Sequence, residues 1–160
     1  EGAVVAISDA SLITSILIIQ LVAIAGALAF VQLSKRFGNV RALMIGACIW
    51  IGACLFAFTI TWATEFYALA VLVGLIMGGS QALSRSTYAK FLPETKDTAS
   101  FFSFYDVSYY MGTVLGTAAY GTVYAVTGDL RLTIVAIGSF FVLGLILLLR
   151  VPKEEVLVAA

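Results

Sequence analysis

Five long apolar stretches alternate with short polar segments along the chain. A helix that spans a membrane needs about 20 mainly apolar residues, and each stretch is close to that length. The sequence therefore predicts an all-α membrane protein, a helical bundle of about five full transmembrane helices. The predicted spans cover about residues 12–33, 42–61, 66–86, 101–127 and 132–149.

The segments that flank the predicted spans are short. Residues 1–11 carry Glu1 and Asp9, so we expect an extracytoplasmic loop or the tail of a missing helix. Residues 12–152 form the predicted transmembrane domain, and residues 153–160 a cytoplasmic tail. The composition agrees, since 62% of the chain is hydrophobic and 11% is charged, against about 45–50% and about 25% in soluble domains. The lipid bilayer is therefore a predicted partner.

The basic residues lie almost entirely at one end of the predicted bundle. Eight of the nine fall in loops on one side: Lys35, Arg36, Arg41, Arg85, Lys90, Lys96, Arg150 and Lys153. Only Arg131 falls on the other side. Because cytoplasmic loops carry excess Lys and Arg, we expect a multi-pass protein of the bacterial inner (plasma) membrane with a cytoplasmic C-terminus. The net charge of zero argues against nucleic acid as a partner.

The spans differ in polarity. The second and fifth are almost wholly apolar and can face lipid, whereas polar groups in the others must face a cavity or a neighbouring helix. The fourth span carries polar side chains at steps of three and four, which share one helical face. They are Asp106, Tyr109, Tyr110, Thr113, Thr117, Tyr120 and Tyr124. This stripe is either the wall of a substrate cavity or a packing face whose hydroxyls bond across helices.

Other polar groups lie in the first and third spans. Ser80, Gln81 and Ser84 fall within one turn of one another, beside two glycines. Gln20 is the lone polar side chain in the middle of the first span. Each of these groups either lines the same cavity or bonds a neighbouring helix, so all four are substrate-cavity candidates.

Arg85 and Asp106 stand at similar distances on either side of the loop around Pro93. Their depths in the membrane should therefore match, and a charge pair between them is plausible. Such a pair could act as a gate. Otherwise Arg85 extends to the interface, and Asp106 lies in water near the cytoplasmic mouth without a role.

Small residues recur every four positions in two spans. Gly74 and Gly78 form one pair and Gly112 and Gly116 another, a spacing that allows close helix contact. The two cysteines, Cys48 and Cys54, are six residues apart and do not share a helical face. We therefore predict neither a disulfide nor a metal site.

The chain carries little that could support catalysis. It has no histidine, no nucleophile beside a base, no paired membrane carboxylates and no nucleotide-binding loop. We therefore predict no enzyme activity, no catalytic residue and no cofactor. The leading hypothesis is a secondary transporter that moves a small solute by alternating access, with Asp106 as the candidate for proton coupling. The alternative is a structural or sensing membrane protein that keeps the same fold.

The number and polarity of the spans resemble the C-terminal half of a major facilitator superfamily transporter. This resemblance implies helices 8–12 of that fold, a small-molecule substrate and an absent N-terminal half as partner. The basic turn SKRFGNVR at 34–41 resembles the superfamily's loop motif, Gly-x-x-x-Asp-Arg-x-Gly-Arg-Lys/Arg. Arg36 and Gly38 match it, Arg41 gives it a basic end, and Lys35 stands where the motif has Asp.

Four segments together resemble one branch of that superfamily, the vacuole effluxer (autophagy-related permease) family. They are GGSQALSRS at 78–86, FFSFYDVS at 101–108, VLG at 114–116 and TGDLRL at 127–132. The resemblance implies an exporter and, from the fungal relatives, amino acids as a candidate substrate. Tyr110 stands where many bacterial members have Lys, and Thr117 where Pro is common.

Overall fold

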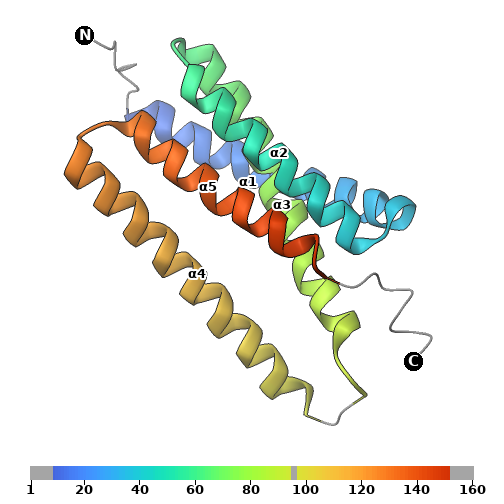
Figure 1. Ribbon diagram of the computed structural model, residues 1–160. Coiled ribbons are helices and arrows are strands. Elements are labelled where there is room, and N and C mark those ends of the chain that lie inside the picture. Colours follow the sequence, from blue (N-terminus) through green and yellow to red (C-terminus); the bar gives the residue numbers. More distant parts are fainter. Residues whose placement is uncertain (1–8, 95–96, 152–160) are drawn as a thin grey trace.

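The computed structural model describes residues 9–94 and 97–151, and these residues contain helices and no strands. The predicted all-α fold is thus confirmed (Figure 1). The five helices are α1 (Asp9–Phe37), α2 (Asn39–Thr59), α3 (Ala63–Phe91), α4 (Thr98–Thr127) and α5 (Leu130–Leu148). The tail predicted at 153–160 lies outside the described residues, as do residues 1–8 of the predicted N-terminal segment.

The turn between α1 and α2 is a single residue. Gly38 has φ +85°, a conformation that residues with a Cβ rarely adopt. The eight-residue turn expected at 34–41 is therefore helical except at Gly38, because α1 ends at Phe37 and α2 begins at Asn39. Lys35 and Arg36 fall in the last turn of α1, where positive charge interacts favourably with the helix dipole.

The starts of α3, α4 and α5 are capped by side chains that satisfy free backbone N–H groups. The Glu65 carboxylate accepts from the backbone N of Thr61 at 2.8 Å and of Trp62 at 3.0 Å, at the start of α3. Asp97 caps α4 and Asp129 caps α5. Gly128 ends α4 with φ +64°, so the predicted turn at Gly128 and Asp129 joins α4 to α5.

The tightest packing joins α1 to α3, and it depends on glycine. A Cβ atom at Gly26 would lie 2.0 Å from the carbonyl oxygen of Leu75, and one at Gly78 would lie 2.1 Å from that of Ala23. Gly74 likewise lies against the backbone of α1. The buried core continues from this contact onto α2. It consists of Phe30, Ala42, Ala53, Ile76 and Leu83.

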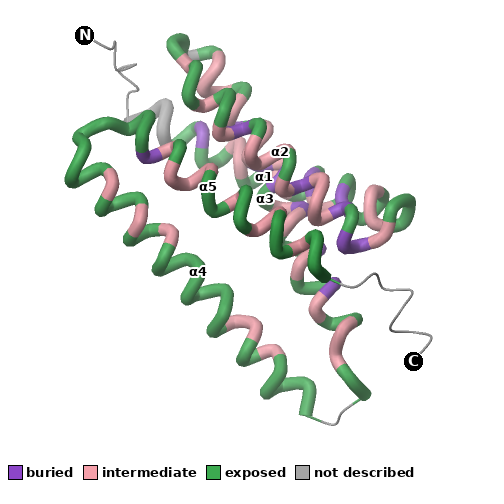
Figure 2. The backbone as a smooth tube through the Cα atoms, in the orientation of Figure 1, coloured by how far each residue is buried: buried purple, intermediate pink, exposed green. Residues whose placement is uncertain are grey.

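Helix α4 stands apart from this core. It lies along α5 and across the bundle from α2 (Figure 1), and none of its residues is buried (Figure 2). Among the described residues, four helices are long and apolar enough to cross a membrane: α1 from Ile13, α2, α3 from Thr64 and α5. With 30 residues, α4 is also long enough, but its Tyr, Ser and Thr side chains make it less apolar.

Candidate functional site

The charged residues predicted to pair lie in contact where α3 and α4 meet. Arg85 Nη2 lies 2.6 Å from Asp106 Oδ1. The side chains of Arg85 and Asp106 are 59% and 44% exposed, respectively. Arg85 comes from the last two turns of α3, and Asp106 from the third turn of α4. The ion pair therefore bridges the two helices close to the loop that joins them.

Two tyrosines, Tyr105 and Tyr88, pack at the same contact between α3 and α4. The Arg85 guanidinium carbon lies 5.5 Å from the centre of the Tyr105 ring, a cation–π arrangement. The Tyr105 hydroxyl donates a hydrogen bond of 3.1 Å to Ser84 Oγ. Tyr88 lies on the next turn of α3, with its ring 5.0 Å from that of Tyr105, and its hydroxyl donates to the Phe101 carbonyl at 2.9 Å. These contacts fix the direction in which Arg85 reaches α4.

The polar contacts extend one turn further from the loop. Gln81 Nε2 donates to the Tyr109 hydroxyl at 3.5 Å, the long limit for a hydrogen bond. Tyr110 packs edge-on against Tyr109 and is 65% exposed. Ser80 instead donates to the carbonyl of Met77 in its own helix. Among the predicted cavity candidates, the structure thus brings Gln81 and Ser84 of α3 against α4.

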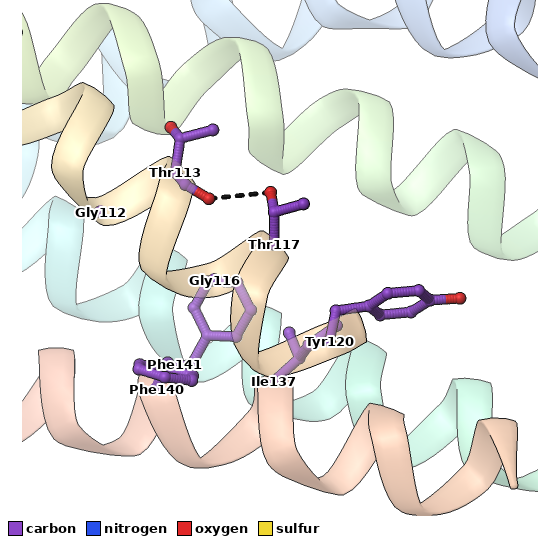
Figure 3. A pocket seen from close by; sticks show the side chains of 8 residues that line it. All are labelled: Gly112, Thr113, Gly116, Thr117, Tyr120, Ile137, Phe140 and Phe141. Carbon is purple, nitrogen blue, oxygen red and sulfur yellow. Dashed lines mark hydrogen bonds between the residues drawn. The ribbon is translucent and has the colours of Figure 1, made fainter. Parts of the chain in front are cut away.

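Three further residues of the α4 stripe, Thr113, Thr117 and Tyr120, border a groove between α4 and α5. Thr113 and Thr117 each donate a hydroxyl to the backbone four residues earlier. Figure 3 shows the second of these bonds, and the Tyr120 ring pointing away from the α5 phenylalanines. The groove has a volume of about 610 Å³, and its lining is Gly112, Thr113, Gly116, Thr117, Tyr120, Ile137, Phe140 and Phe141.

The two predicted glycine pairs have different surroundings. Gly74 and Gly78 lie against the backbone of α1. A Cβ at Gly112 or Gly116 would meet no described atom within 4 Å. The second pair therefore lines the open groove, and no described helix packs against it.

Gln20 lies on an exposed face of α1 and makes no hydrogen bond to any residue that the structure describes. It is separate from the α3–α4 contacts.

The predicted loop motif forms the α1–α2 turn described above. Lys35, Arg36 and Arg41 are exposed there. The buried polar residue at this turn is Asn39, which is 2% exposed.

Asn39 connects three helices. Its side-chain oxygen accepts hydrogen bonds from Ser34 of α1 and, at 3.1 Å, from Lys90 of α3. Its Nδ2 has no hydrogen-bond partner in the part of the chain that the structure describes. Asn39 therefore ties the ends of α1, α2 and α3 together.

Tyr88, Tyr105 and Asn39 are not among the site residues predicted from the sequence. A signal for the tyrosines was available, because Tyr105 precedes Tyr109 by one helical turn and Tyr88 follows Ser84 by the same spacing. Asn39 gave no such signal. Its burial depends on the sharp turn at Gly38 and on the approach of α3.

Residues 2–160 match the family described as "Vacuole effluxer Atg22 like". The chain belongs to this family. The prediction made from the segments at 78–86, 101–108, 114–116 and 127–132 is therefore confirmed.

The relatives of the chain include a bacterial protein and two fungal proteins. The uncharacterized MFS-type transporter YxiO of Bacillus subtilis (strain 168) is 29% identical over 153 residues, which cover 96% of this chain and 36% of YxiO. Autophagy-related protein 22-1 of Phaeosphaeria nodorum is 33% identical over 91 residues, 57% of this chain and 16% of that protein. Autophagy-related protein 22 of Vanderwaltozyma polyspora is 31% identical over 88 residues, which cover 55% of this chain and 16% of that protein.

The chain thus spans about a third of the Bacillus relative and less of each fungal one. No solved structure matches it. The family and the four long apolar helices together establish an integral, multi-pass membrane protein of the major facilitator type.

Proposed function

We propose that the chain is the C-terminal half of a secondary transporter that moves a small solute by alternating access. In such carriers the substrate site lies near the middle of the membrane, between two repeats. The name of the Bacillus relative, an MFS-type transporter, supports the transport activity. The α4 stripe would line the central cavity, opposite an N-terminal half.

The observation that carries this proposal is the Arg85–Asp106 pair, which joins α3 to the unburied polar helix α4. Ionisable residues within membrane helices are energetically costly, and they face a protein interior or a water-filled cavity. Both side chains are substantially exposed, and no residue of α4 is buried by the described helices. A cavity between two halves would provide the water that these groups need.

A small solute would be recognised here by hydroxyl and amide groups. Gln81, Ser84 and Tyr109 offer both donors and acceptors along the α3–α4 contact. These groups suit a zwitterionic substrate such as an amino acid, because the adjacent ion pair supplies one charge of each sign. Export is the direction that we propose, with the proton as candidate coupling ion and Asp106 as the group that would carry it.

The test is uptake and efflux in proteoliposomes of the protein in its full native length. A labelled amino-acid panel is used, with and without a pH gradient. Asp106→Asn removes the charge with little change in shape. Glu94→Gln is the matched control, because Glu94 is an exposed carboxylate outside the stripe.

We expect movement of at least one amino acid that depends on the pH gradient, is abolished by Asp106→Asn and survives Glu94→Gln. Movement without any pH dependence would remove the proton from the proposal and leave Asp106 as a gating or structural residue. If no solute of the panel moves, the amino-acid assignment fails. A structural or sensing role would then be favoured if a wider range of solutes also stays in place.

A further inference from the structure

A second groove lies on the opposite side of the bundle from α4. It follows one face of α2, which lies across the bundle from α4 (Figure 1). The groove has a volume of about 630 Å³, and Phe37, Arg41, Met44, Ile45, Cys48 and Ile49 line it. Apart from Arg41 its lining is apolar, so the transport site described above leaves this groove without a role.

Positive charge gathers at one end of this groove. Arg41 lines it, and the Arg36 guanidinium carbon lies 5.5 Å from the centre of the Phe37 ring, at the same end. Neither arginine forms an ion pair with a residue that the structure describes. The sequence has no Asp or Glu between Asp9 and Glu65, so α2 has no acidic side chain to neutralise them.

The length of the groove matches one leaflet of a bilayer. From Arg41 to Ile49 a helix rises about 12 Å at 1.5 Å per residue. Half of a hydrocarbon core of about 30 Å is about 15 Å. With Arg41 at the headgroup level, the apolar lining would therefore lie beside the acyl chains of a single leaflet.

We infer that this groove is a binding site for an anionic phospholipid. One acyl chain lies along Met44, Ile45 and Cys48, and the phosphate is bound by Arg36 and Arg41. A guanidinium group is well suited to phosphate, since it donates two parallel hydrogen bonds. Basic residues at the membrane surface attract anionic headgroups, and the adjoining groove adds a place for one particular lipid molecule.

The test is native mass spectrometry of the full-length protein in detergent, titrated with phosphatidylglycerol, phosphatidylcholine or glycerol 3-phosphate. We expect phosphatidylglycerol to bind more tightly than phosphatidylcholine, and soluble glycerol 3-phosphate to bind hardly at all. Each basic residue near an anionic lipid is worth about fivefold in affinity. The double variant Arg36→Gln/Arg41→Gln should therefore weaken phosphatidylglycerol binding about 25-fold.

Three further variants make the result specific. Arg150→Gln removes an exposed arginine at the same end of the bundle but outside the groove, and should leave binding unchanged. Arg36→Lys/Arg41→Lys keeps the charge and should keep most of the preference for phosphatidylglycerol. Cys48→Trp fills the groove at an exposed position and should weaken both phospholipids while leaving their ratio unchanged.

The inference is overturned if the wild-type protein binds both phospholipids equally. It is also overturned if Arg150→Gln weakens binding as much as the double variant, because the preference would then belong to the whole charged surface. Binding of glycerol 3-phosphate as tight as that of phosphatidylglycerol would indicate a site for a free anion, and an undiminished affinity in Cys48→Trp would rule out the acyl chain.

Discussion

The glycine contact between α1 and α3 gives the sharpest prediction of stability. In Gly78→Ala the new Cβ would lie 2.1 Å from the backbone oxygen of Ala23, whereas an ordinary contact begins at 3.4 Å. Because the obstacle is backbone, the two helices must separate by about 1.3 Å, the difference between these distances. Overpacking of this kind costs about 1–3 kcal/mol, while Ala gains about 0.5–1 kcal/mol over Gly in a helix.

With the middle of each range, the expected net loss is about 1 kcal/mol, or a Tm lower by about 2–4 °C. Thermal unfolding of the full-length protein in detergent measures it. Gly52→Ala is the matched control, because a Cβ at Gly52 in α2 meets no described atom within 4 Å. Its Tm should stay the same or rise. Equal Tm values for the two variants would refute the close approach of α1 and α3.

A second substitution tests whether the loss arises from helix separation. Gly26→Ala places a Cβ 2.0 Å from the carbonyl oxygen of Leu75, in the same interface. Once one alanine has moved the helices apart, the second meets less resistance. The double variant of Gly26 and Gly78 should therefore lose less than the sum of the single losses.

Three further predictions concern the turn between α1 and α2 and the ion pair between α3 and α4. Gly38→Ala should lower the free energy of unfolding by about 1–3 kcal/mol, because φ +85° with ψ 159° is a conformation that essentially only glycine adopts; thermal unfolding measures it, and an unchanged Tm would contradict the tight turn. Asn39→Ala should lower the free energy of unfolding by about 1–3 kcal/mol, because it removes the buried acceptor that α1 and α3 share. Thermal unfolding measures this loss as well, and an unchanged Tm would contradict the shared acceptor. A double-mutant cycle on Arg85→Gln and Asp106→Asn should give a coupling energy of about 0.2–1 kcal/mol, as for exposed ion pairs; a coupling energy well above this range would contradict the exposure of the pair.

The pattern of apolar residues was enough to predict the helices. Their lengths are set by the thickness of the bilayer, which acts on each helix separately. The Arg85–Asp106 pair was also within reach, because two residues equally distant from a loop between antiparallel helices lie at the same depth. Local signals of this kind do not depend on how the bundle packs.

Packing could not be predicted in the same way. Gly74 and Gly78 have the same spacing as Gly112 and Gly116, yet only the first pair contacts a neighbouring helix in the structure. A spacing of four shows that a helix has a small-residue face, but which helix lies opposite depends on the whole bundle. The burial of Asn39 escaped prediction for the same reason, since it requires three helix ends to meet.

The helix contacts of the bundle differ in how easily they can change. Between α1 and α3 the backbones touch through glycines, so a displacement of about 1 Å already loses close packing. Between α3 and α4 the rings of Tyr88 and Tyr105 meet. The polar contacts there are one ion pair and hydrogen bonds at 2.9, 3.1 and 3.5 Å, all made by side chains. Water can replace each of them at a cost of about 1 kcal/mol or less. If the protein alternates between two states, α1 and α3 should therefore move together, and the rearrangement should occur between α3 and α4. A small coupling energy between Arg85 and Asp106 is what such a movable contact requires.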